Sequence, residues 1–222
     1  EDKYYDFTVE RRKIEVPTVA YEMLEDNIGY VQVTEFDEVT SDQYIAAVDD
    51  LKAQGMEGLI VDIRDNPGGL LSCVVDMLDY MLPEGTIVYT EDKNGEGDTY
   101  TSDAEHYFDL PLAVLVNGNS ASASEIFSGA IQDYETGTII GTQTFGKGIV
   151  QSILPFNDGS AIKITVSRYF TPRGTCIHGE GITPDVEVDL NEELKTKLTI
   201  EKSEDNQLQK AIENVKEQIA AE

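Results

Sequence analysis

Three serines alternate with alanines at the start of a predicted helix: Ser120, Ser122 and Ser124. A lysine flanked by glycines, Lys147, follows 25 positions after Ser122. A serine hydroxyl becomes a nucleophile only when a base removes its proton, and a lysine whose pKa is lowered by burial can be that base. Neither of the two histidines has a comparable context. The pattern therefore predicts a serine hydrolase that uses lysine in place of histidine.

Helix capping explains part of the same pattern. Ser120 or Ser122 could cap the helix, with Glu125 in its first turn. Capping does not account for the alternation of serine with alanine, and it is compatible with a nucleophile at the same place. A surface turn would also accommodate the lysine, but the apolar neighbours Phe145 and Ile149 indicate partial burial.

A glycine-containing loop at residues 65–69 follows a predicted strand and precedes a helix. Gly68 and Gly69 would let the backbone approach a ligand closely and direct its N–H groups outward. Such donors suit an oxyanion hole, to which the backbone N–H of Ala123 could also contribute. An ordinary strand-to-helix turn explains the same residues.

Gln151 lies four residues after Lys147. One helical turn would bring their side chains together. A straight strand would leave them on one face but about 13 Å apart. The sequence leaves both arrangements open.

The composition narrows the range of partners. The 222 residues carry a net charge of -27, which disfavours nucleic acid and anionic lipid. The two cysteines, Cys73 and Cys176, lack the spacing of a zinc site, and two free buried thiols fit better than a disulfide. We expect no metal and no cofactor. No run of residues is long and apolar enough to span a membrane.

The elements that must position these residues follow the hydrophobic pattern. Nearly continuous apolar runs predict buried strands at 28–33, 59–63, 112–116 and 138–141, and 160–169 alternates like a half-exposed strand. Helices are expected at 41–54 with Ser41 as N-cap, at 70–81, at 121–132 and at 204–222. Short strands are expected at 7–9 and 14–16, and a hairpin turn at 93–97. Repeated strand–turn–helix units with buried strands predict an α/β fold with crossover helices, peripheral strands and a C-terminal helix.

An ordered set of motifs over about residues 10–190 resembles the protease core of the carboxyl-terminal processing peptidases, also called tail-specific proteases. The matching segments are 16–19, 28–30, 62–69, 116–125, 141–148, 163–165, 169–172 and 181–185. The resemblance implies an α/β core similar to the crotonase and Clp-protease superfamily. It also implies serine endopeptidases that cut proteins near the carboxyl terminus through an acyl-enzyme, without ATP or metal.

The resemblance assigns roles to particular residues. Ser122 matches the nucleophile, Lys147 the general base, and Gln151 the residue that orients the lysine. Gly68 and Ala123 match the oxyanion-hole amides.

The resemblance also implies a setting. Relatives act on protein or peptide substrates with apolar C-terminal tails. They are exported to the periplasm, the cell envelope or the extracellular space. A homo-oligomer is compatible with the resemblance. Relatives carry a PDZ domain before the core, for which this sequence has no room, so we expect weak or unregulated activity. The expected organisation is an N-terminal segment at 1–27 packed on the core, the protease core at 28–190 and a C-terminal helical segment at 191–222.

Two other classes of function remain open. One is a non-catalytic module on the same fold that binds a hydrophobic ligand or a peptide, as in the retinoid-binding proteins of the eye that this core resembles. Retention of both Ser122 and Lys147 speaks against it. The other is a crotonase-type acyl-CoA enzyme. Such enzymes usually bind the phosphates of an adenine nucleotide, to which a chain of net charge -27 is poorly suited. We therefore expect no CoA.

Overall fold

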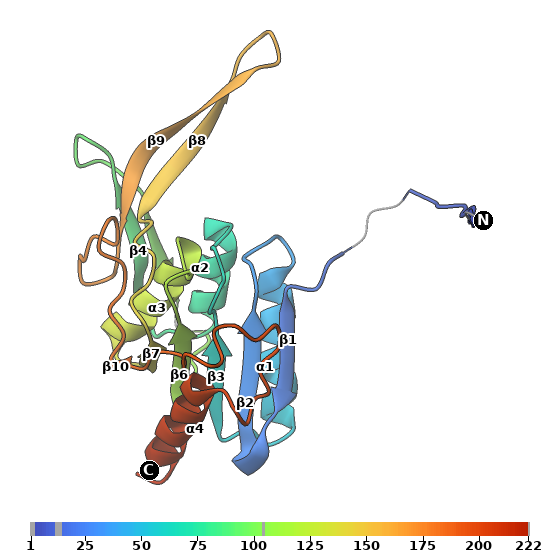
Figure 1. Ribbon diagram of the computed structural model, residues 1–222. Helices are drawn as coiled ribbons and strands as arrows, with labels where there is room; N and C mark the ends of the chain where they lie inside the picture. The colour runs from blue at the N-terminus through green and yellow to red at the C-terminus, as the bar shows by residue number, and fades with distance from the viewer. Residues whose placement is uncertain (1–2, 12–14, 104, 222) are drawn as a thin grey trace.

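The computed structural model describes residues 3–11, 15–103 and 105–221. Its centre is a six-stranded sheet in the order β1-β2-β3-β6-β7-β10, in which β1 runs antiparallel to β2 and the other neighbours pair in parallel (Figure 1). The strands are β1 (Val19–Met23), β2 (Ile28–Val33), β3 (Gly58–Asp62), β6 (Leu112–Val116), β7 (Thr138–Gly141) and β10 (Val186–Glu187).

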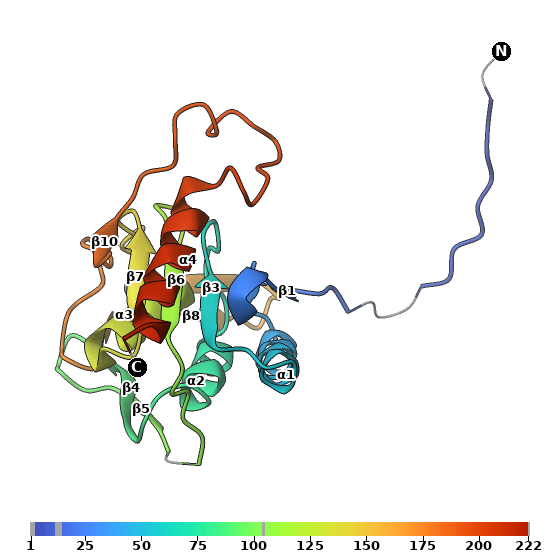
Figure 2. The ribbon, with the colours of Figure 1, turned by 90° about the horizontal axis from the view of Figure 1, so that it is seen from below.

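Helices cover both faces of this sheet. α1 (Thr40–Ala53), α2 (Leu71–Asp79) and α3 (Ala123–Tyr134) lie on one face, and α4 (Asn206–Ile219) lies across the other (Figure 2). A short 3-10 turn, η1 (Glu25–Asn27), joins β1 to β2. Two apolar clusters result, one on each side of the sheet. Every residue of β3 and β6 is buried, which explains their continuous apolar sequences.

The parallel order places the loops after β3 and β6 side by side. Asp62 pairs with Leu115 near the carboxyl ends of these neighbouring strands. The loop at 65–69 and the serine-containing turn at 117–122 therefore leave the same edge of the sheet. This is the edge at which open α/β sheets bind ligands.

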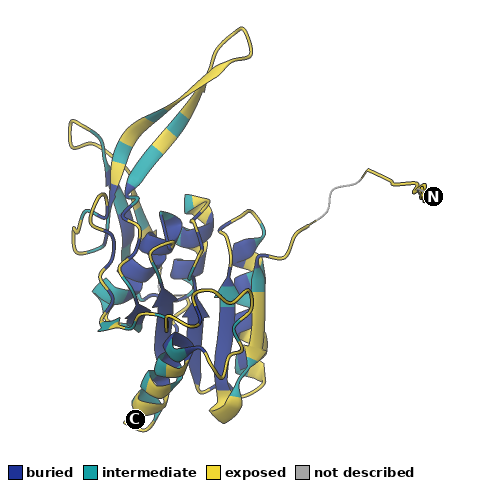
Figure 3. Ribbon diagram, viewed as in Figure 1, coloured by how far each residue is buried: buried dark blue, intermediate teal, exposed yellow. Residues whose placement is uncertain are grey.

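A second sheet has the order β5-β4-β9-β8. It consists of β4 (Gly85–Glu91), β5 (Thr99–Ser102), β8 (Ile149–Pro155) and β9 (Ala161–Phe170). β8 and β9 form a long antiparallel hairpin that projects away from the body of the protein (Figure 1). Its outer part is largely exposed, whereas the central strands β2, β3, β6 and β7 of the six-stranded sheet are largely buried (Figure 3). Lys147 lies immediately before this hairpin.

The α/β class is confirmed, and so are the strands expected at 28–33, 59–63, 112–116, 138–141 and 160–169, each within about two residues. The four expected helices and the hairpin connection between β4 and β5 are also present. α4 packs on its own domain, across β3, β6 and β7. Both cysteines are free; Cys73 is buried and Cys176 is partly exposed.

Some local predictions are wrong. The strand expected at 7–9 is an exposed irregular segment, since nothing in the sheet pairs with it. Residues 3–11 are exposed throughout, so this part of the N-terminal segment does not pack on the core. For the strand expected at 14–16, residue 14 lies outside the described residues, and Glu15 and Val16 are not in a strand. Ser41 does not cap α1, which begins one residue earlier after Val39. β1 and β8 were not predicted, because both are edge strands without a continuous apolar run. None of the described helices is both long and apolar enough to cross a membrane.

Candidate active site

Ser122 occupies the N-cap position of α3 in a strained backbone conformation. Its φ of 58° and ψ of -114° lie outside the regions that a side chain normally permits. Residues held in such conformations cluster at active sites, and a sharp turn between strand and helix exposes a nucleophile in many hydrolases. The Ser122 hydroxyl therefore lies at the N-terminus of α3, toward which the free N–H groups of the first turn and the positive end of the helix dipole point.

The three serines have different environments. Ser120 is fully buried; its Oγ donates to Ile63 O at 2.8 Å and accepts from the Asn117 amide at 3.0 Å. Ser124 is also fully buried and donates to Asn66 O at 2.9 Å. Both therefore tie the serine turn to the loop after β3.

Ser122 alone among the three is partly exposed. Within the described part of the chain, its hydroxyl donates no hydrogen bond to another residue, whereas the hydroxyls of Ser120 and Ser124 each donate to a backbone carbonyl. The structure thus leaves one serine free to react.

Glu125 is a fully buried carboxylate at the centre of the site. Its Oε2 accepts from the Ser122 amide at 2.9 Å and from the Lys147 amide at 2.8 Å. Its Oε1 accepts from Thr144 Oγ1 and from the Gly146 amide, each at 2.6 Å. A buried carboxylate needs such donors, and here they come from both loops that carry the predicted dyad. The sequence predicted Glu125 only as a first-turn residue.

Lys147 is half-buried in the loop between β7 and β8. Its backbone is fixed by Glu125, and the Phe145 amide donates to Ser120 O at 3.0 Å. Across residues 3–11, 15–103 and 105–221, its side-chain nitrogen forms no hydrogen bond or ion pair.

The two predicted oxyanion-hole residues are adjacent in space. A side chain at Gly68 would come within 2.8 Å of Ser122 Cβ and 2.9 Å of the Ala123 nitrogen, and φ at Gly68 is +100°. Only glycine permits this approach. The Ala123 amide has no acceptor among the described residues. The Gly68 amide, in contrast, donates to Asn66 Oδ1 at 2.9 Å.

Asn66 belongs to the predicted loop at 65–69, but the sequence predicted no role for this residue by itself. It is fully buried, donates to Val33 O at 2.9 Å, and its carbonyl accepts from the Ala121 amide at 3.1 Å. Asparagine in a turn after a strand was the only signal for it. Its contacts fix the loop at 65–69 against the serine-containing turn at 117–122.

Gln151 lies on the exposed side of β8, paired with Thr165. The strand arrangement is therefore the one present, and the helical alternative is excluded. The register between β8 and β9 shifts between Val150 and Gln151. No hydrogen bond joins Gln151 to Lys147 in the described part of the chain. The orienting role of Gln151 stays a prediction.

Asp65 forms a second brace between the same two loops. Its Oδ1 accepts from Asn117 Nδ2 at 3.0 Å and Asn119 Nδ2 at 2.7 Å, while its amide donates to Asn117 Oδ1 at 3.0 Å. These bonds continue the pairing of β3 with β6 beyond the ends of the strands. Asp65 has a φ of 60°, a conformation that aspartate tolerates better than most residues.

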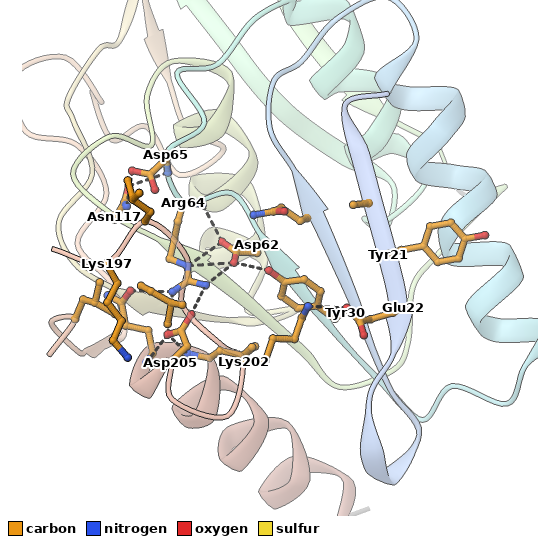
Figure 4. A pocket seen from close by; sticks show the side chains of 17 residues that line it. Tyr21, Glu22, Tyr30, Asp62, Arg64, Asp65, Asn117, Lys197, Lys202 and Asp205 are labelled. Carbon is orange, nitrogen blue, oxygen red and sulfur yellow. Dashed lines mark hydrogen bonds and ion pairs between the residues drawn. The ribbon is translucent and has the colours of Figure 1, made fainter. Parts of the chain in front are cut away.

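A buried ion network lies on the α4 side of the sheet. Arg64 contacts Asp62 at 2.6 Å and Asp205, the N-cap of α4, at 2.8 Å (Figure 4). Burial alone would lower the pKa of Arg64, but the hydrogen bonds and charges of the two aspartates raise it above its ordinary value. Burial, and then the charge of Asp62, also raise the pKa of Tyr30, which donates to Asp62 at 2.8 Å.

This network borders a cavity of about 520 Å³ between β1, β2 and the segment before α4. The network joins α4, through Asp205, to Arg64, which directly precedes the loop at 65–69. Among residues 3–11, 15–103 and 105–221, no three His, Cys, Asp or Glu side chains are grouped so that they could hold a metal ion.

The fold and this site together define an α/β protein with a partly exposed serine at the N-terminus of a helix. The model of peptidase family S41 matches residues 27–188. The chain belongs to peptidase family S41.

Within that family the chain is similar to carboxyl-terminal processing proteases, as the sequence motifs predicted. It is 41% identical over 184 residues to the carboxyl-terminal-processing protease of Synechocystis sp., covering 81% of this chain and 43% of that protein. It is 39% identical over 186 residues to the corresponding protease of Bacillus subtilis, covering 83% of this chain and 40% of that protein. The chain thus spans less than half the length of these relatives.

A solved structure agrees. The photosystem II D1 C-terminal processing protease superposes with a TM-score of 0.73 at 35% identity, over 80% of this chain and 50% of that one.

Proposed function

We propose that this chain is the catalytic core of a serine endopeptidase that cuts proteins at or near their carboxyl termini through a Ser122–Lys147 dyad. One observation carries the proposal: Ser122 alone of the three serines is partly exposed and keeps its hydroxyl proton unshared, and its backbone shares a carboxylate oxygen of Glu125 with the backbone of Lys147.

The reaction follows from these positions. Lys147 removes the proton of Ser122 as Oγ attacks the carbonyl carbon of the scissile bond. The tetrahedral intermediate collapses, the peptide nitrogen takes the proton from Lys147, and an acyl-enzyme remains. Water, deprotonated by Lys147, then attacks the carbonyl carbon of the ester. As this second tetrahedral intermediate collapses, Ser122 Oγ leaves and takes the proton back from Lys147, and the acid is released.

The negative oxygen of each tetrahedral intermediate needs donors aimed at it. The free amide of Ala123, at the first turn of α3, supports its assignment as one donor. We assign the Gly68 amide as the second, and it would serve once its bond to Asn66 Oδ1 opens. Gln151 would orient the amine of Lys147 from the start of the projecting hairpin.

The names of the relatives support substrates cut near their carboxyl termini. We extend the proposal to protein tails with apolar residues and to a location outside the cytoplasm, in the periplasm, the cell envelope or beyond. A substrate-binding PDZ domain elsewhere in the full protein belongs to the same proposal.

The test uses a fluorophosphonate probe and an unfolded protein such as β-casein. The chain should be labelled at Ser122 and should cleave the casein, and cleavage should rise with pH between about pH 6 and 10, because only the neutral amine accepts a proton. Ser122→Ala and Lys147→Ala should abolish both. Labelling undiminished in Lys147→Ala would remove the lysine from the mechanism, and labelling at another serine would overturn the dyad.

A further inference from the structure

Thr144 lies three residues before Lys147, and the segment 181–185 packs against it. Its side chain is buried, and its backbone amide donates to Ile182 O at 3.1 Å. The Ile182 amide donates in return to Thr144 Oγ1 at 2.7 Å. The segment 181–185 therefore contacts, through Thr144, the loop at 142–148 that carries Lys147 (the lysine loop). This segment is one of the sequence motifs, and the proposed dyad gives it no role.

The direction of the hydrogen bonds is determined by their partners. Thr144 Oγ1 accepts a hydrogen bond from the Ile182 amide, so its own proton points to its other neighbour, Glu125 Oε1, at 2.6 Å. A carboxylate can only accept. An ordered chain thus runs from the Ile182 amide through the threonine hydroxyl to Glu125.

Gly181 makes this contact possible. A side chain there would come within 2.7 Å of Thr144 O and 2.8 Å of Thr144 Oγ1, and φ at this position is +73°. Any other residue would push the 181–185 segment away from the lysine loop.

We propose that Thr144 is a positioning residue of the peptidase: its hydroxyl fixes the rotamer of Glu125 and, through it, the alignment of Lys147 with Ser122. This inference rests on the proposed function of the dyad. A carboxylate anchored at one oxygen only by the Gly146 amide can rotate, and rotation displaces the two amides on its other oxygen. A displacement of about 1 Å at a reacting group can lower the rate about a hundredfold.

Three variants of the full chain test the proposal. Thr144→Val keeps the shape of the side chain and removes the hydroxyl, while Thr144→Ser keeps the hydroxyl. Thr171→Val is the matched control: Thr171 is equally buried and accepts from the Thr175 amide at 3.2 Å, but has no contact with Glu125.

Hydrogen exchange of the Gly146 and Lys147 amides measures directly how firmly these amides are bonded to Glu125, and the measurement does not depend on peptidase activity. Both amides should exchange at least about tenfold faster in Thr144→Val, and should be unchanged in Thr144→Ser and Thr171→Val. Equal exchange in Thr144→Val and wild type, or equal acceleration in the Thr171→Val control, would overturn the positioning role.

Steady-state hydrolysis measures the consequence. Thr144→Val should lower kcat about 10- to 100-fold with KM changed less than about twofold, and Thr144→Ser should stay within about threefold of wild type. Unchanged kcat in Thr144→Val, with Ser122-dependent cleavage intact, would refute the proposal and leave the dyad standing. If wild type shows no Ser122-dependent cleavage, the proposed function fails, and the exchange rates alone decide whether Thr144 holds the lysine loop.

Discussion

Ser122 and Lys147 donate their backbone N–H groups to one and the same oxygen, Glu125 Oε2, at 2.9 and 2.8 Å. A single buried carboxylate therefore sets the distance between two loops that are 25 residues apart in the chain. The proposed nucleophile and the proposed base are coupled through the backbone, whatever the conformation of their side chains.

Glu125→Gln should lower kcat about a hundredfold with little change in KM. The amide keeps one accepting oxygen and turns a donor toward backbone N–H groups that need an acceptor, which separates the two loops. The measurement is casein cleavage together with probe labelling. Glu135→Gln, on an exposed residue just after α3, is the control and should retain full activity. Wild-type kcat in Glu125→Gln would show that the shared carboxylate does not align the dyad.

Ser120→Ala and Ser124→Ala should each lower the free energy of unfolding by about 1 kcal/mol, because each removes one buried hydrogen bond to a carbonyl that keeps a second donor. Both variants should still be labelled by a fluorophosphonate. Ser122→Ala should lose labelling, with the free energy of unfolding within about 1 kcal/mol of wild type. Urea unfolding and mass spectrometry of the labelled peptide check these results, and lost labelling in Ser124→Ala with stability preserved would contradict them.

Asp205→Ala should lower the free energy of unfolding by about 3 kcal/mol, since it removes the cap of α4 and leaves Arg64 with only one carboxylate in a buried site. Amides of α4 should exchange faster in the variant. Glu213→Ala, which breaks an exposed ion pair on the same helix, should have little effect. Equal losses in the two variants would argue against a special role for the buried network.

The free energy of unfolding should decrease as the pH rises from about 9 to 11. Burial raises the pKa of the Cys73 thiol to about 11, from an ordinary value of 9.0. The unfolded chain loses this proton first, so it binds fewer protons than the folded chain over that interval, and alkali favours unfolding. Cys73→Ala should flatten the dependence, measured by urea unfolding at several pH values, while Cys176→Ala serves as the control. An unchanged slope in Cys73→Ala would exclude the thiol as its source.

The sequence by itself determined the elements whose signals are local. Continuous apolar runs predicted β3 and β6, since strands covered on both faces have no polar side to show. The stripe of Leu208 and Val215 predicted the packed face of α4. Exposed edge strands such as β8 carry no such signal, and it was missed. The motif set was enough to indicate peptidase family S41.

Only the tertiary structure decided which serine is free, because Ser120 and Ser124 are occupied by carbonyl groups from the loop after β3, more than 50 residues away. It also decided that Glu125 holds both loops. These relationships depend on hydrogen bonds between segments distant in the chain, which form only when the parallel strands bring their carboxyl ends to one edge. Residue spacing predicts a nucleophile and a base; the packing of the loops determines whether they share a carboxylate.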